Sequence, residues 1–303
     1  MATTQASGQL NGAWAQQRIW SQTANRLKQR IDQARLAALL LGVATAVLAV
    51  AAGQAGGLSG LAGRTLSAAA AITAGVATVV QRRAGTGQIR DWTRARSASE
   101  GLKTEIYSYL AGGTAYTDAD SRGARLGAEA RGITESVADL QRHTLGITPG
   151  TKPLPPVRDV DSYISGRVDD QISNYYTPKA GLYDRRVRRL RTAGGLLGVT
   201  AVVLAALAAA FQVGGLAAWV PVVTTIATSV AAYIAAARYD HLVIEYLRTA
   251  QRLQHLRQDY LGNPASDPAA FVDACEAAIS VENQAWMARW NPPGGGSLAG
   301  QDT

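Results

Sequence analysis

The sequence predicts an all-α membrane protein made of two tandem transmembrane helical hairpins, with four spans in all. Long cytoplasmic helical extensions of these spans are expected to form a coiled-coil-like bundle. Between Arg35 and Arg82 the only charged residue is Arg64, and between Arg191 and Arg238 there is none. A membrane-spanning helix needs about 20 largely apolar residues. Each of these two regions is therefore long enough for a hairpin of two spans.

Each expected hairpin has one span on either side of a glycine-containing turn. The spans are 36–53, 65–81, 193–212 and 217–237, and the turns are 53–63 and 212–215. A helical hairpin in a soluble bundle is the alternative, but a soluble core helix normally carries a polar stripe. None of the four stretches shows such a stripe. With only 2 Phe and 2 Met in 303 residues, the apolar content is mostly small side chains, which favours close helix packing in a membrane.

Basic residues gather at the ends of the hairpins and not at their turns. Five arginines directly precede the third span: Arg185, Arg186, Arg188, Arg189 and Arg191. Because cytoplasmic segments carry an excess of Lys and Arg, both hairpins are expected to enter and leave on the cytoplasmic side. The arginines then anchor the span at the inner leaflet and contact lipid phosphates, while Trp219 anchors the far interface. A nucleic-acid patch at 185–191 is the alternative, but it would press a duplex against the lipid surface.

The two halves of the sequence resemble each other. "GVATAVLAVAA" at 42–52 resembles "GVTAVVLAALA" at 198–208, and "AITAGVATVV" at 71–80 resembles "TIATSVAAYI" at 225–234. We expect two repeats, a linker with four prolines between them, and a disordered tail. Their residues are 10–145 for the first two-span repeat, 146–160 for the linker, 161–290 for the second repeat and 291–303 for the tail.

Heptad-like seams flank the spans and predict helices that continue into the cytoplasm and pack together. The seam before the first span is Trp20, Ala24, Leu27, Ile31 and Ala34. The seam after the second is Trp92, Ala95, Ser99, Leu102, Ile106 and Tyr109. The seam after the fourth is Tyr239, Leu242, Tyr246, Thr249, Leu253, Leu256 and Tyr260. A final helix at about 268–290 would add Phe271, Cys275, Ile279 and Trp286. Thr177 and Pro178 read as the N-cap and first position of the helix that leads into the third span.

Three motifs of the second repeat are similar to those of a known family. They are "VDDQISNYYTPKA" (168–180), "AAYIAAARYDHLVIEYLRTAQRLQHL" (231–256) and "CEAAISVENQAWMARW" (275–290). Residues 161–290 resemble the SLATT family, a bacterial two-transmembrane effector domain associated with nucleotide second-messenger and SLOG systems. Residues 14–141 resemble a degenerate copy that keeps the hairpin and the paired glutamates but lacks the Cys, the Asn and the paired tryptophans. The resemblance implies a pore-forming or membrane-disrupting effector that a partner's signal activates.

The sequence contains no catalytic constellation, so we expect no enzyme, cofactor or metal site. His143, His241 and His255 lack metal-ligand spacing. Buried as a small apolar side chain, Cys275 is not expected to be a nucleophile. The candidate bundle or signal contacts are Tyr246, Leu253, Glu276, Glu282, Asn283 and Trp286. The last four residues are compatible with two functions: they form hydrogen bonds between helices, or they contact a signal.

The polar residues inside the spans are hydroxyls, and no ionisable side chain lies within them, which disfavours pumps and proton-coupled carriers. The candidates are Thr73, Thr78, Thr224, Thr225, Thr228 and Ser229. They either pack helices together or line a wet pore in an oligomer. Four spans per chain are too few to enclose a wide pathway, so a pore requires several chains.

Two functions are compatible with these features. The first is a homo-oligomeric, non-enzymatic effector of a bacterial defence system, in the inner membrane with both termini cytoplasmic. Its partners would be the lipid bilayer, other copies of the chain, and a cytosolic sensor protein or nucleotide signal, but no nucleic acid. The second is a scaffold membrane protein that recruits cytosolic partners through its helical bundle without conducting ions.

Overall fold

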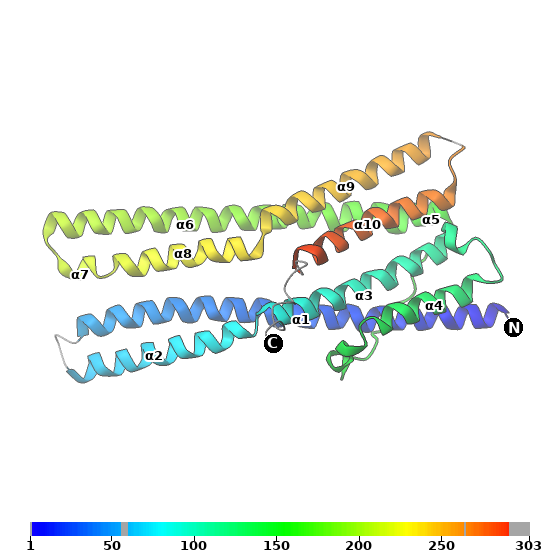
Figure 1. Cartoon of the computed structure of the whole chain (residues 1–303). Helices are drawn as coiled ribbons and strands as arrows, with labels where there is room; N and C mark the ends of the chain where they lie inside the picture. Colours follow the sequence, from blue (N-terminus) through cyan, green and yellow to red (C-terminus); the bar gives the residue numbers. More distant parts are fainter. Residues whose placement is uncertain (1, 56–59, 264, 291–303) are drawn as a thin grey trace, which may run out of the picture. The chain divides into compact units, whose positions relative to one another are not determined.

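A computed structural model describes residues 2–55, 60–263 and 265–290, and these residues are helical with no strand among them. The long helices are α1 (Ala2–Ala55), α2 (Gly60–Arg82), α3 (Thr86–Ala111), α6 (Thr177–Phe211), α8 (Val220–Ala237), α9 (Tyr239–Gly262) and α10 (Pro268–Trp290) (Figure 1). The shorter helices are α4 (Arg122–Glu135), α5 (Val160–Tyr163) and α7 (Gly214–Ala217). Two 3-10 helices, η1 (Thr114–Tyr116) and η2 (Ala138–Thr144), and two π-helices, η3 (Ile164–Asp169) and η4 (Gln171–Tyr176), complete the set.

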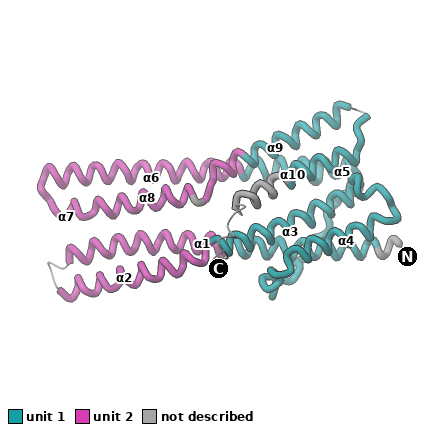
Figure 2. Tube along the Cα trace, viewed as in Figure 1, with its two compact units in different colours: residues 1–29, 86–179, 245–303 teal, residues 30–85, 180–244 magenta. Residues whose placement is uncertain are grey.

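These helices form two compact units, which Figure 2 colours separately. The span unit holds the described residues of 30–85 and 180–244, and the bundle unit holds those of 1–29, 86–179 and 245–303. Each unit contains residues of both repeats, so the boundaries predicted for the repeats stay a prediction. The predicted tail, 291–303, lies outside the described residues.

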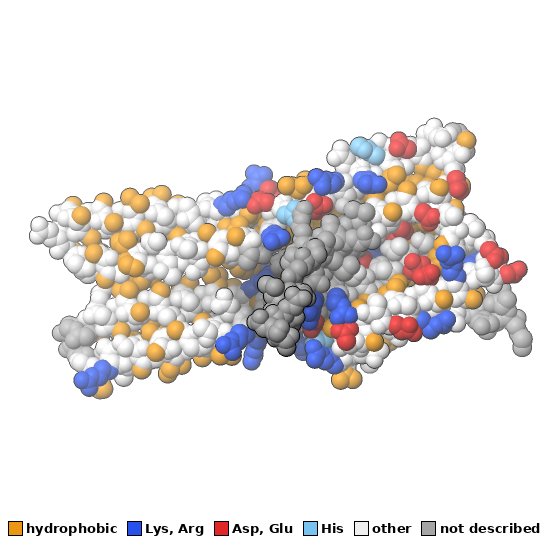
Figure 3. Space-filling view, viewed as in Figure 1, with side chains coloured by type: hydrophobic (Ala, Val, Ile, Leu, Met, Phe, Trp, Pro, Cys, Tyr) orange, Lys and Arg blue, Asp and Glu red, His pale blue; other side chains and the backbone are white. Residues whose placement is uncertain are grey.

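The span unit presents apolar side chains on its surface. Four helical segments are long and apolar enough to cross a membrane, and at most 11% of the residues in the most apolar part of each are buried. Leu196 and Val202, for example, are 64% and 70% exposed. On the face that Figure 3 shows, charged side chains lie mainly over the bundle unit, and hydrophobic ones lie along α6 and α8. A lipid environment accounts for this surface, because contiguous apolar surface of this extent is unfavourable in water. The chain is an all-α membrane protein, as predicted.

The two hairpins of the span unit differ in how their helices are joined. In the first, the Thr45 hydroxyl donates to the Thr73 oxygen across 3.0 Å and so links α1 to α2. In the second, α6 ends before Gln212, which has a positive φ of 53°, and the short helix α7 then connects α6 to α8. The fourth span begins at Val220 and not at 217 as predicted, because Pro221 has no N–H and is favoured in the first turn of a helix.

The predicted seams are buried. All five residues of the seam before the first span and all six of the seam after the second are less than 9% exposed. The seam after the fourth span is buried from Tyr239 to Leu253, whereas Leu256 and Tyr260 are half-buried. On α10, Phe271, Cys275 and Ile279 are buried. Most of these residues lie in the core of the bundle unit, whereas Ile31, Ala34, Tyr239 and Leu242 belong to the span unit.

The predicted helix start at Thr177 is wrong. The chain is already helical from Val160, and Thr177 has helical φ and ψ angles of −63° and −47°. Its N–H bonds to the carbonyl of Ile172, five residues earlier. This π-helical turn widens the helix directly before Pro178, whose ring would otherwise clash with a carbonyl of the preceding turn. The proline is therefore accommodated inside a continuous helix and does not begin a new one.

Residues 147–157 of the predicted linker form no helix or strand and are hydrogen-bonded to α1. The indole Nε1 of Trp14 and the Nη1 of Arg18 both donate to the carbonyl of Lys152, at 3.0 and 2.9 Å. The linker ends where the Asp159 side chain accepts from the Ser162 N–H at 2.8 Å and caps α5. The first two bonds attach the middle of the linker to α1, and the last fixes its end at α5.

Candidate functional site

A buried ion pair lies at the centre of the bundle unit. Arg167 on η3 donates through Nε to Oε1 of Glu276 at 2.8 Å and through Nη2 to Oε2 at 2.9 Å. The two side chains are 1% and 2% exposed. The geometry is bidentate, which makes the pair both strong and directional. Burial of such a pair costs desolvation free energy, so the surrounding polar groups decide how well it is stabilised.

Both repeats contribute to the surroundings of this pair. From the second repeat, the Tyr163 hydroxyl donates to Glu276 Oε1 at 3.0 Å. From the first, the Thr104 hydroxyl on α3 donates to Oε2 at 2.9 Å. The guanidinium carbon of Arg167 lies 4.2 Å from the ring centroid of Tyr107, also on α3. The site therefore joins α10, η3 and α3, and residues from both halves of the sequence complete it.

Two charged side chains of α3 lie beside the ion pair and respond to it. Burial, together with the positive charge of Arg167, lowers the pKa of Lys103 to about 8. Burial acts to raise the pKa of Glu100, but the charges of Arg96, Lys103 and Arg167 outweigh it and lower that pKa overall. The charge of Glu276 raises the pKa of Arg167 despite its burial, so the guanidinium group stays protonated at neutral pH. The Nη1 atom of Arg167 is buried without a hydrogen-bond partner among the described residues.

The lowered pKa of Lys103 predicts a pH-dependent stability. Between pH 8 and the ordinary value of 10.5 the unfolded chain holds a proton that the folded chain has released. Lys103 therefore contributes a rise in stability with pH across this interval, since at this group the unfolded state binds more protons. We expect Lys103→Met to remove this rise. Unfolding midpoints of both proteins in detergent, followed from about pH 8 to about pH 10, measure the difference; parallel curves would contradict the prediction.

A cluster of aromatic side chains from η4 and α9 extends the candidate site. Tyr175 accepts a hydrogen bond from Arg96 Nη2 at 3.0 Å, and its ring centroid lies 5.2 Å from that of Tyr176. Tyr176 in turn lies 5.8 Å from Tyr246, one of the predicted bundle contacts. Leu253, another predicted contact, is fully buried. The π-helical turns present these neighbouring side chains to α9, and such turns often occur at functional sites.

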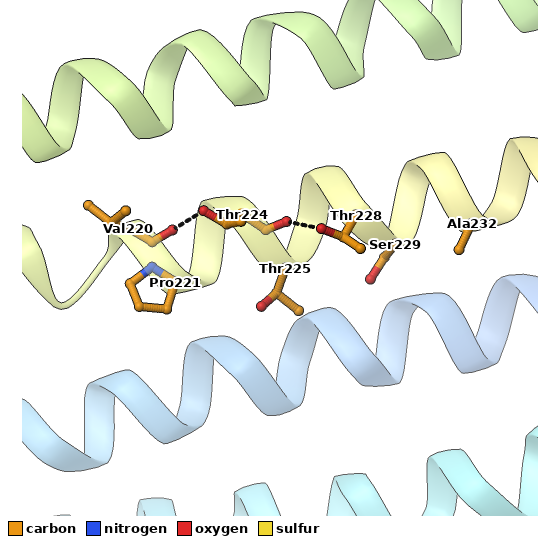
Figure 4. A pocket seen from close by; sticks show the side chains of 7 residues that line it. All are labelled: Val220, Pro221, Thr224, Thr225, Thr228, Ser229 and Ala232. Atoms are coloured by element: carbon orange, nitrogen blue, oxygen red, sulfur yellow. Dashed lines mark hydrogen bonds between the residues drawn. The ribbon is translucent and has the colours of Figure 1, made fainter.

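The predicted hydroxyl residues of the fourth span lie along one face of α8 (Figure 4). Val220, Pro221, Thr224, Thr225, Thr228, Ser229 and Ala232 line an open groove there. Thr224 and Thr228 donate to the carbonyls of Val220 and Thr224 at 2.8 and 2.9 Å. Their protons are thus used within the helix, while their oxygens can still accept bonds from water. On α2, exposed Thr78 bonds back to the Gly75 carbonyl at 2.7 Å in the same way.

The remaining predicted residues fall into three groups. The five arginines from Arg185 to Arg191 are exposed on α6, and Trp219 is half-buried directly before α8. The side chains of Glu282, Asn283 and Trp286 lie outside the described part of the structure. Cys275 is fully buried, and burial raises the pKa of its thiol to about 12, which keeps it protonated at neutral pH. No cluster of three metal-ligating side chains occurs in the described residues.

Comparison with known families assigns each repeat separately. Residues 163–286 match the model of the SMODS and SLOG-associating 2TM effector domain, abbreviated SLATT. The second repeat is therefore similar to the SLATT domain. Residues 18–124 match a different model, described as a protein of unknown function (DUF4231), which is consistent with a tandem arrangement. No curated protein and no solved structure matched the chain. The SLATT repeat contains Arg167 and Glu276, and the first repeat supplies Thr104 and Tyr107.

Proposed function

We propose that the protein is a homo-oligomeric, pore-forming effector of a bacterial defence system in the inner membrane. Both termini lie in the cytoplasm, and a cytosolic partner or nucleotide signal acts on the bundle unit. The match of the second repeat to a two-transmembrane effector domain carries this proposal. The chain also has four candidate membrane spans. An effector that is itself inserted in the membrane can act by making that membrane permeable.

The groove on α8 supports a water-filled pathway. Its hydroxyl groups lie on a helix that is otherwise apolar, and the residues that line it all come from that one helix. A groove of this kind becomes a closed pathway only when other helices face it. Several copies of the chain around one axis supply those helices, and rings of hydroxyl oxygens then replace part of an ion's hydration shell.

The buried ion pair supports a route from the bundle unit to the spans. Arg167 is on η3, which leads through η4 into α6, a helix that contains the third span. A signal that separates Glu276 from Arg167 changes the packing of this helical segment against α10 and α3. A packed core changes between discrete arrangements and does not deform continuously, and a switch requires two such arrangements.

Membrane potential in bacterial cells tests the proposal. Cells that express the full chain are expected to depolarise, and Glu276→Gln, which weakens the ion pair, is expected to lower the expression level at which they do so. Thr224→Val with Thr228→Val keeps the shape of the groove and removes its oxygens, so the potential should recover. A protein that reaches the membrane in normal amount and never changes the potential, with or without Glu276→Gln, would contradict a pore and favour the scaffold function.

A further inference from the structure

The five arginines before the third span are not equivalent, and three of them bond to the protein. Arg188 Nε lies 2.9 Å from Asp184, one turn earlier on α6. Arg191 Nη2 lies 2.7 Å from Asp240 on α9. Arg186 donates to the Tyr233 hydroxyl at 3.4 Å, and its guanidinium carbon lies 5.5 Å from the ring of Tyr239. Arg186 and Arg191 hold α6 to the ends of α8 and α9 in the span unit, whereas Arg188 is paired within α6.

The other two, Arg185 and Arg189, make no hydrogen bond or ion pair with any residue in the described part of the chain. They are one helical turn apart on α6 and are both exposed. Two guanidinium groups on one face at this spacing repel each other unless an anion lies between them. Their geometry therefore calls for a ligand from outside the chain.

The face of α6 that carries this arginine pair continues into the span as an apolar surface. Leu196, Val203 and Leu207 follow Arg189 at separations of seven and four residues, which keeps them on the same side of the helix. They are 64%, 49% and 41% exposed, so this side of α6 is not covered by the rest of the chain. Leu196 lies about 10 Å along the helix from Arg189. One helix face thus presents positive charge at headgroup depth and apolar side chains at acyl-chain depth.

We propose that Arg185 and Arg189 bind the phosphate of an anionic phospholipid, whose acyl chains lie along Leu196, Val203 and Leu207. Arginine matches phosphate oxygens with paired N–H groups, and two of them surround one phosphodiester from one side. The nearest carboxylate on the same helix, Asp184, is already neutralised by Arg188. This site depends on insertion of the span in a membrane and not on whether the protein conducts ions.

Lipid binding to the full chain in detergent tests the site. Phosphatidylglycerol is titrated into the purified protein, and bound lipid is counted by native mass spectrometry. Each arginine near a membrane surface contributes about 1 kcal/mol, so Arg185→Gln with Arg189→Gln should raise the apparent Kd roughly 25-fold. The matched control is Arg186→Gln with Arg191→Gln, which removes the same charge from the same cluster and leaves the Arg188–Asp184 pair intact. It should change the Kd by less than about threefold, while lowering thermal stability.

Three outcomes would overturn the proposal. Equal losses of binding in the two double variants would mean that only the summed charge of the cluster attracts lipid. Equal binding of phosphatidylcholine would mean that the anionic headgroup is not recognised. Soluble glycerol phosphate binding as tightly as the lipid would mean that the apolar face of α6 contributes nothing. None of these readouts depends on ion flux, so the lipid site and the pore can fail independently.

Discussion

Replacement of Glu276 by alanine is expected to lower the free energy of unfolding by about 3–5 kcal/mol. The substitution leaves the Arg167 guanidinium charged, fully buried and without the carboxylate to which it bonds. Tyr163 and Thr104 lose their hydrogen-bond acceptor at the same time. Denaturant unfolding of the bundle unit in the detergent-solubilised full chain, followed by Trp fluorescence, measures the loss.

Two further variants separate this effect from general damage. In Arg167→Met with Glu276→Leu neither charge remains, so most of the lost stability should return. Asp139→Ala removes the carboxylate of a second two-contact ion pair, with Arg94 at 2.6 and 2.7 Å, but Asp139 is exposed. It should cost no more than about 1 kcal/mol. If Glu276→Ala costs as little as Asp139→Ala, the buried pair does not stabilise the bundle unit.

An aspartate in place of Val203 is expected to oppose membrane insertion of the third span by about 2.5–3.5 kcal/mol. Val203 is 49% exposed near the middle of this span, and lipid is the medium that it meets. Leu182 is a matched control, since it is 47% exposed on the same helix before the arginine cluster. In water the two aspartates would be tolerated equally. In a membrane only the one at Val203 is taken into hydrocarbon.

The fraction of full-length chain that resists alkaline extraction from membranes measures this difference. We expect a large loss for Val203→Asp and a value close to that of the unaltered protein for Leu182→Asp. Arg185→Gln at the edge of the span provides a second comparison, since it removes charge and should not reduce extraction resistance in the same way. Equal behaviour of the two aspartate variants would show that α6 is surrounded by protein or water.

Local patterns in the sequence predicted most of the fold. The missing charges located the four spans, because a charge in hydrocarbon is costly wherever it occurs along a span. Seven-residue spacing located the buried seams, since Trp92, Leu102 and Ile106 recur on one helix face and each has to be covered. Both signals come from neighbouring residues and need no knowledge of the tertiary structure.

The centre of the site was harder to predict because it depends on distant residues. Glu276 was recognised as a candidate, but its partner Arg167 lies 109 positions away in the sequence. Ile164 and Val168 flank Arg167 in "YISGRVDD", but this is a weak sign of a buried charge because Asp169 and Asp170 follow closely. The contribution of Thr104 and Tyr107 from the other repeat has no sequence signal of this kind. The π-helical turns before Pro178 were also missed, since proline usually indicates a helix boundary.

Imaging of the full chain in lipid nanodiscs by electron microscopy tests the proposed pore most directly. We predict several copies around a common axis, with the face of α8 that carries Thr224, Thr225, Thr228 and Ser229 directed toward a water-filled centre. The face of α6 with Leu196 and Val203 should then be directed toward lipid. A single copy in each nanodisc, or an assembly whose axis is lined by the apolar face of α6, would contradict a pore built on the α8 hydroxyl groups.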